Sequence, residues 1–402
     1  MLSLHPPPRH VVVTAMGISQ ILGWGTSFYF PAVFSAPIVA DTGWPLGWVV
    51  GGITIGLLVA GLISPAVGRV VGRKGGRPVL AASSLLFALG LAGIGLSPVL
   101  PVYLLSWAVV GAAMATGLYD AAFAALGRLY GAEARGPITS LTLFGGFAST
   151  VCWPLSAYLI ELCGWRGACL IYAGLHLAVA LPLQLVMPAH AADVVSKPAD
   201  LDLRPEESTP PSRETPIFVL LALVLTLAGG IGSILVVHML TFLQARGVEF
   251  AAAVTLGTLF GPAQVAARVI ERMFGAHYHP IWTMIAACAL MAIGLLLLFL
   301  LAGLPILVLA ITLYGAGYGI LWVARGTLPL ALFGPARFPR LMGRLGFPSL
   351  IVLACTPFAG ALLIEWYGVD LTIALLTGSA MINLALVAIL WRVSRFHRAG
   401  AI

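Results

Sequence analysis

Apolar runs of about 20 residues or more recur along the whole chain, and they limit its fold more than any other feature. A run of this length crosses a hydrocarbon core of about 30 Å as an α-helix. It must be helical there, because lipid offers the backbone no hydrogen-bond partners. Strands of a membrane barrel would instead alternate polar and apolar residues over about 10 positions. The runs therefore predict an all-α membrane protein.

Twelve membrane-spanning helices are expected, and the composition is that of a membrane protein. Hydrophobic residues make up 60% of the chain, and its mean hydropathy is +1.04, beyond the range of ordinary soluble domains. The first run is too long for a removable signal peptide and lacks a small-residue cleavage site. The expected spans are 11–37, 45–68, 78–98, 101–126, 137–160, 166–187, 216–243, 249–270, 280–302, 305–332, 346–364 and 370–391.

The few charged residues, 9% of the chain, are distributed unequally between the two sets of span ends. Acids predominate at one set, with Asp41, Glu161, Glu249, Glu365 and Asp370. Such asymmetry predicts that the basic ends and both termini are cytoplasmic, in a bacterial inner (plasma) membrane. The net charge of +7 is thus explained by topology, and no nucleic-acid partner is expected. The basic ends carry Arg9, Arg69, Arg73, Lys74, Arg77, Arg128, Arg135, Arg272, Arg337, Arg340, Arg344, Arg392, Arg395 and Arg398.

A polar segment divides the chain into two halves of six spans. The stretch "PAHAADVVSKPADLDLRPEESTPPSRETP" has too few apolar residues to form a core and is predicted to be a flexible cytoplasmic linker. The expected domains are a six-helix bundle at 1–187, the linker at 188–215 and a second bundle at 216–402. Paired bundles of this kind are typical of alternating-access carriers. The chain lacks a Gly-x-x-x-x-Gly-Lys-Ser/Thr loop, so no nucleotide or other cofactor is expected.

The stretch "GRVVGRKGGRPVL", Gly68 to Leu80, resembles the signature Gly-x-x-x-Asp-Arg-x-Gly-Arg/Lys-Arg of the major facilitator superfamily. Gly68, Arg73, Gly75 and Arg77 match it, whereas Gly72 stands at the Asp position and Gly76 replaces a basic residue. The resemblance implies two pseudo-symmetric six-helix bundles, a monomer, and a cytoplasmic latch between the halves.

Without the acid, such a latch would depend on Arg73 and Arg77 meeting acids or helix C-termini elsewhere. Alternatively, the turn only anchors the topology.

The stretch "SFYFPAVFSAPIVADTGWPLGWVVGG" resembles the monocarboxylate-transporter-like branch of that superfamily. The branch uses an eighth-helix Arg for the substrate carboxylate, with an Asp one turn earlier and a Lys in the first helix. The resemblance places Arg268 at the Arg position, but Gln264 at the Asp position and Ala32 near that of the Lys. The drug-antiporter signature Gly-x-x-x-Gly-Pro-x-x-Gly-Gly is absent from the fifth span.

Three charges within the spans are candidate functional residues, because a charge in hydrocarbon costs several kcal/mol unless it is paired or hydrated. Arg325 precedes Arg337 by twelve residues, about 18 Å of helix, and is expected near the midplane. There it faces an anionic substrate, a partner acid or a polar cavity. The alternative is a fixed ion pair or a bond to a backbone carbonyl.

Asp120 lies about 12 Å before Arg128 and is the candidate for proton coupling. The alternatives are a permanent counter-ion to Arg325 or a position at the interface. Arg268 lies only about 6 Å before Arg272, so depth alone places it at the membrane edge, with its side chain reaching out to water. Polar and aromatic residues at substrate depth, namely Tyr29, Trp24, Gln264, Tyr318, Trp322 and Tyr119, are candidate contacts or packing residues.

The remaining reactive residues do not suggest an enzyme. The five cysteines show no metal-ligand spacing; Cys163 and Cys169 could pair, or act as small apolar residues. His277-Tyr278-His279 lacks a third ligand, so no metal site is expected. The sequence predicts a secondary transporter of a small organic anion of the carboxylate type, with proton symport through Asp120. The alternatives are a proton-driven exporter of drugs or metabolites and, with less support, a polytopic membrane enzyme.

Overall fold

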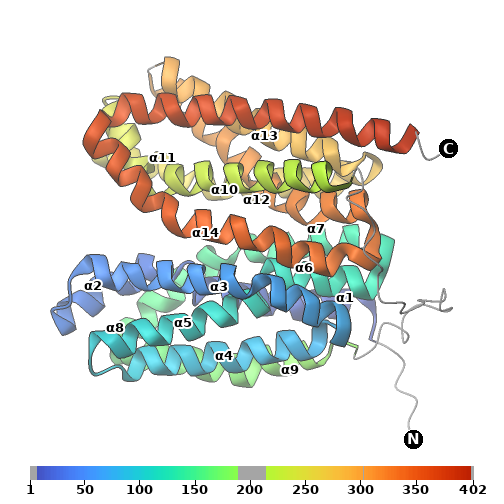
Figure 1. The fold of residues 1–402 in the computed structure, drawn as a ribbon. Coiled ribbons are helices and arrows are strands. Elements are labelled where there is room, and N and C mark those ends of the chain that lie inside the picture. Colours follow the sequence, from blue (N-terminus) through green and yellow to red (C-terminus); the bar gives the residue numbers. More distant parts are fainter. Residues whose placement is uncertain (1–6, 189–213, 302, 400–402) are drawn as a thin grey trace, which may run out of the picture. The chain divides into compact units, whose positions relative to one another are not determined.

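The computed structural model describes residues 7–188, 214–301 and 303–399, and these residues are helical almost throughout (Figure 1). No strand occurs in this part of the chain. The predicted linker 188–215 lies outside the described residues except at its ends.

The first half of the chain forms nine α-helices. Two short elements interrupt them, a 3-10 helix η1 (Gly131–Ala134) and a π-helix η2 (His176–Ala180). The α-helices are α1 (Arg9–Gly25), α2 (Phe30–Thr42), α3 (Leu46–Lys74), α4 (Gly76–Leu96), α5 (Leu100–Gly117), α6 (Tyr119–Tyr130), α7 (Arg135–Gly146), α8 (Ala148–Leu175) and α9 (Leu181–Leu185).

The second half has fewer but longer helices. They are α10 (Glu214–Ala245), α11 (Phe250–Thr258), α12 (Phe260–Phe274), the 3-10 helix η4 (Gly275–His277), α13 (Pro280–Leu300) and α14 (Leu304–Ala399).

Eight helical stretches of the described residues are long and apolar enough to cross a membrane. Two of them, Leu100–Leu185 and Leu304–Ser394, are far longer than one crossing requires. Gly131 and Gly164 interrupt the first with positive φ angles, and Gly334 and Gly368 interrupt the second. Each therefore supplies three passes and the other six stretches one each, which gives twelve passes.

Several predicted spans are continuous in the sequence but broken in the structure. The first pass breaks between α1 and α2, the fourth between α5 and α6, the fifth between α7 and α8, and the eighth between α11 and α12. A hydropathy average over about 20 residues does not reveal these breaks, because each one involves only one to four residues within an apolar stretch. The basic turn after the predicted span 45–68 is shorter than the span bounds imply: α3 continues to Lys74, and only Gly75 separates it from α4.

The contacts group the chain into two compact units. Unit 1 comprises residues 1–194 with 333–354, and unit 2 comprises 195–332 with 355–402. In unit 1, α4 packs against α5 and α8, and α3 packs against α5. The α3–α5 crossing is very close, since a side chain at Gly111 would meet Gly56 Cα at 2.7 Å. Large apolar side chains such as Leu62, Leu89 and Leu105 remain exposed, as the hydrocarbon of a bilayer requires.

Candidate functional site

Arg268 on α12 is buried in unit 2, with 4% of its surface exposed. Its Nε donates a hydrogen bond to the Gly319 carbonyl at 3.0 Å, and its terminal nitrogen donates to Gln264 Oε1 at 3.3 Å. Gly319 permits this approach, because a side chain there would lie 2.6 Å from the Gln264 carbonyl oxygen. The interpretation of Arg268 as a residue that reaches out to water at the membrane edge is therefore wrong.

Arg325 ends a ladder of aromatic rings on the first segment of α14. Tyr314, Tyr318, Trp322 and Arg325 follow one face of the helix at spacings of four, four and three residues. Successive ring centroids are 6.4 and 6.1 Å apart, and the Arg325 guanidinium carbon lies 5.7 Å from the Trp322 centroid. Arg325 is only 6% exposed. The ladder thus places a permanent cation beside an aromatic face.

Aromatic residues also gather at the break in the first pass, within unit 1. Trp24 lies 5.6 Å from Phe28, which lies 5.5 Å from Tyr29, all between ring centroids. Tyr29 in turn contacts Trp153 of α8 edge to face at 6.1 Å. The tilted ring of Tyr119 lies 4.9 Å from Trp24. The structure thus brings Trp24, Tyr29 and Tyr119, three of the predicted contact residues, into one cluster.

The break in the fourth pass is held by a polar side chain from the first pass. At Leu118 the backbone becomes extended, so the Gly117 carbonyl leaves the helical hydrogen-bond pattern. Gln20 Nε2 donates to that carbonyl at 2.6 Å, and Trp24 Nε1 donates to Gln20 Oε1 at 3.1 Å. This chain satisfies groups that would otherwise be buried without partners.

Asp120 lies in the first turn of α6, immediately after this break. A helix N-terminus favours a negative charge, which gives the carboxylate a local structural reason to be there. Asp120 is partly buried, and its Oδ2 lies 3.0 Å from where a Cβ at Gly346 would be. The acid therefore stands close to the backbone of the segment 333–354, which belongs to the same unit.

Gly72, at the position of the missing acid, accepts a hydrogen bond at its carbonyl from Arg128 of α6. The predicted latch comprises Gly68, Arg73, Gly75 and Arg77, and the contact of Arg128 was not expected, because nothing in the sequence shows that α6 ends beside α3. Gly68 makes the second contact of this region: a side chain there would lie 2.9 Å from Gly343 Cα.

His176, which the sequence analysis did not select, lies buried on the π-helix η2. Its Nε2 is 2.9 Å from the Thr26 hydroxyl, and Thr26 donates its own proton to the Leu22 carbonyl. This contact between His176 and Thr26 ties the sixth pass to the break in the first. The ring also stacks on Phe87 at 4.6 Å. A π-helix disrupts the regular period and leaves no signal in hydropathy.

The remaining candidates have ordinary structural roles. His279 Nδ1 accepts from the Ile281 backbone N–H and caps α13. All five cysteines are free, so Cys163 and Cys169 do not pair. Within the described residues, no group of three or more His, Cys, Asp or Glu side chains is placed to hold a metal ion.

Comparisons with known proteins agree with this architecture. A search of curated protein sequences finds no match. Among solved structures, the human organic anion transporter MFSD10 (TETRAN) superposes with a TM-score of 0.74 at 17% identity, covering 95% of this chain and 100% of that one. The proton:xylose symporter XylE gives 0.74 at 12% identity, with 94% of each chain covered. The outward conformation of FucP gives 0.67 at 12%, covering 96% of this chain and 98% of that one. These likenesses show the fold.

The family model of the Major Facilitator Superfamily matches residues 15–278, well over half of the chain. Together with the all-helical architecture of twelve passes, this match means that the protein is an integral membrane transporter of small solutes rather than an enzyme. The chain belongs to the Major Facilitator Superfamily.

Proposed function

We propose that this secondary transporter moves a small organic anion of the carboxylate type by alternating access, with proton symport. The observation that carries the proposal is the pair of buried arginines in unit 2, Arg268 and Arg325, which are 4% and 6% exposed. Arginine stays charged at any pH a cell meets. A bilayer protein retains such charges at depth where they have a function.

The surroundings of Arg325 suggest the kind of anion. Its guanidinium can bind a carboxylate through two parallel hydrogen bonds. The aromatic ladder of Tyr318 and Trp322 beside it offers apolar surface to the body of an organic solute. Arg268 is held by Gln264 and Gly319, so its rotamer is restricted before any solute arrives. We propose Arg325, Arg268, Gln264, Tyr318 and Trp322 as solute contacts, and in unit 1 Trp24, Tyr29 and Tyr119.

Asp120 is the proposed proton carrier. It is a partly buried acid at the broken fourth pass, and its first-turn position keeps it next to the Gly117–Gln20–Trp24 chain. A helix break at the depth of the substrate is a common ion-site design in secondary transporters.

The latch and the orientation remain part of the proposal. We place the basic α3–α4 turn on the cytoplasmic side of an inner membrane, because cations concentrate at that end of the passes. Gly68 and Gly75 shape the proposed latch, and Arg73 and Arg77 supply its cations. Arg128 takes part by holding the Gly72 carbonyl.

The protein acts as a monomer.

The solved structures of similar fold do not select the substrate. One is named an organic anion transporter and another a proton:xylose symporter, but identities of 17% and 12% support fold alone. The monocarboxylate-like assignment therefore still depends on the first two passes and on Arg268.

The test is uptake of a panel of labelled organic anions into proteoliposomes, with and without an inward proton gradient. We expect saturable uptake by the wild type, loss on Arg325→Ala and partial retention on Arg325→Lys, which keeps the charge but not the planar fork. Arg392→Ala, an exposed arginine near the end of the chain, is the matched control and should leave uptake unchanged.

Asp120→Asn tests the coupling. We expect it to abolish the stimulation by the proton gradient while leaving anion exchange at equal pH. If no anion is taken up and a cationic dye is exported instead, the anion proposal is wrong and the exporter alternative replaces it.

A further inference from the structure

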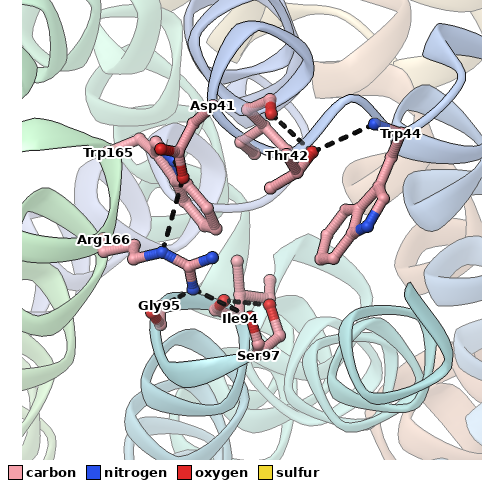
Figure 2. Close-up of polar contacts among 9 residues, drawn as sticks. Asp41, Thr42, Trp44, Ile94, Gly95, Ser97, Trp165 and Arg166 are labelled. Carbon is pink, nitrogen blue, oxygen red and sulfur yellow. Dashed lines mark hydrogen bonds and ion pairs between the residues drawn. The ribbon is translucent and has the colours of Figure 1, made fainter. Parts of the chain in front are cut away.

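Arg166, at the start of the sixth pass, joins three helix ends in unit 1 (Figure 2). One terminal nitrogen donates to the carbonyls of Gly95 and Ser97 at 3.1 and 2.8 Å, at the C-terminus of α4. Its Nε lies 3.6 Å from Asp41 Oδ2, near the end of α2. Trp165 donates to the same carboxylate oxygen at 3.0 Å, and the guanidinium carbon of Arg166 lies 4.2 Å from the Trp165 ring centroid.

Arg246 makes a similar arrangement in unit 2. Its Nε donates to the Leu298 carbonyl at 2.9 Å and another nitrogen donates to the Phe299 carbonyl at 3.2 Å, both in the last turn of α13. Its remaining terminal nitrogen is 3.0 Å from Asp370 Oδ1, at the start of the twelfth pass. Arg246 directly follows α10, the seventh pass.

The two arrangements occupy equivalent helices of the two repeats. Each joins the end of the first helix of its repeat, the end of the third and the start of the sixth. Arg166 and Asp370 both stand two residues after a glycine of positive φ, Gly164 and Gly368. The arginine caps the third helix in both, but it comes from the sixth helix in unit 1 and from the first in unit 2. The acid comes from the other helix each time.

A helix C-terminus explains why an arginine is needed in each place. The last carbonyls of α4 and α13 have no partner within their helices. They also carry the negative end of the helix dipole, which a cation stabilises. One guanidinium can satisfy two carbonyls and still bind a carboxylate, because it has five donors in a plane. An exposed ion pair alone contributes little to stability, so the hydrogen bonds to the carbonyls provide most of the stabilisation.

We propose that these are two equivalent clasps, each an arginine and an acid holding the ends of the first, third and sixth helices of one repeat, with the two charges exchanged between repeats. The clasps keep each set of three helix ends together while the protein changes conformation during transport. The proposal does not depend on the identity of the solute.

The exchange of charges between the repeats makes a swap experiment possible. Arg166→Asp should lower the thermal unfolding midpoint in detergent by several degrees and should reduce the yield of folded protein. Asp41→Arg should do the same to a smaller extent. The double variant Asp41→Arg/Arg166→Asp imitates the arrangement at Arg246 and Asp370, and should recover more than half of the midpoint lost by Arg166→Asp alone. The corresponding swap Arg246→Asp/Asp370→Arg should behave likewise.

Glu161→Arg is the control, because Glu161 is an exposed acid three residues before Gly164 and has no ion pair in the described part of the chain. It should leave the midpoint unchanged. Additive losses in the double variant, or an unchanged midpoint in Arg166→Asp, would overturn the proposal. If the charge reversals do not yield folded protein, the variants Arg166→Lys and Arg166→Gln test the proposal instead. We expect Arg166→Lys to keep a higher unfolding midpoint than Arg166→Gln, because lysine keeps the charge. Equal losses of midpoint in the two variants would contradict the proposal.

Discussion

Arg268 shows how much a single residue depends on its neighbours. Counting residues along α12 places it one turn from Arg272, at the edge of the membrane. In the structure it instead extends into unit 2 and binds the Gly319 carbonyl of α14. The direction of the side chain follows from where α14 lies, and Gly319 is 51 residues from Arg268 along the chain. The same holds for His176, whose partner Thr26 belongs to the first pass.

Gly319 is the residue on which this contact most depends. We expect Gly319→Val to abolish transport and lower stability, because its Cβ would meet the Gln264 carbonyl at 2.6 Å and displace Arg268. Overpacking of this kind costs about 1–3 kcal/mol. Thermal unfolding and anion uptake measure the two effects. Gly378→Ala on the same helical stretch has nothing within 4 Å of its Cβ and should be tolerated. If the two variants had the same unfolding midpoint and the same uptake, the close approach of Gly319 to Gln264 would be contradicted.

Gln20 gives a second prediction at the residue scale. Gln20→Leu leaves the buried Gly117 carbonyl and Trp24 Nε1 without the partners they have now. A buried unsatisfied group costs about 1–3 kcal/mol, so the thermal midpoint should fall by several degrees. Gln244→Leu, at an exposed position near the end of α10, is the comparison and should change it little. An unchanged midpoint for Gln20→Leu would mean that the broken fourth pass does not need this bond.

At the scale of elements, the main departure from the sequence prediction is that long passes are built from pieces. Hydropathy located the apolar stretches, because burial in lipid depends on the summed character of about 20 residues. It did not locate the breaks at Leu118, Phe147 and Leu259, since each of them involves one residue: Leu118 is extended, and Phe147 and Leu259 stay in the right-handed helical region. At Leu118 the break leaves the Gly117 carbonyl to a side chain, Gln20, instead of the backbone.

The helix α3 offers a matched pair of glycines one turn apart. A Cβ at Gly68 would lie 2.6 Å from the Pro339 carbonyl oxygen, whereas one at Gly72 would meet its nearest neighbour at 3.8 Å. We therefore expect Gly68→Ala to push the segment 333–354 away and to lower the transport rate severalfold, and Gly72→Ala to leave it nearly unchanged. The measurement is the initial rate of anion uptake, with equal amounts of each variant reconstituted into proteoliposomes. A normal rate for Gly68→Ala would contradict a role for this contact in transport.

At the scale of the whole molecule, the asymmetric distribution of charge predicts the orientation. Single cysteines replacing Arg69 and Glu161, in a variant without the five natural cysteines, should report it by labelling in intact cells. A membrane-impermeant maleimide should label the cysteine at 161 and not the one at 69, because positively charged span ends stay in the cytoplasm. Labelling at 69 alone would reverse the proposed orientation. After the membrane is disrupted, the maleimide should label both cysteines, which controls for the reactivity of each thiol.

The sequence by itself determined the all-helical membrane architecture, the pairing of two six-helix repeats and the class of transporter. These depend on sums over many residues: apolar length, charge asymmetry and the matches in Gly68–Leu80. Only the tertiary structure decided that Arg268 is buried against Gly319, that Arg128 holds the carbonyl of Gly72, and that Arg166 and Arg246 bind carbonyls at the ends of α4 and α13. Each of these contacts joins residues more than fifty positions apart. Such contacts depend on which helices lie side by side, and local periodicity carries no record of that.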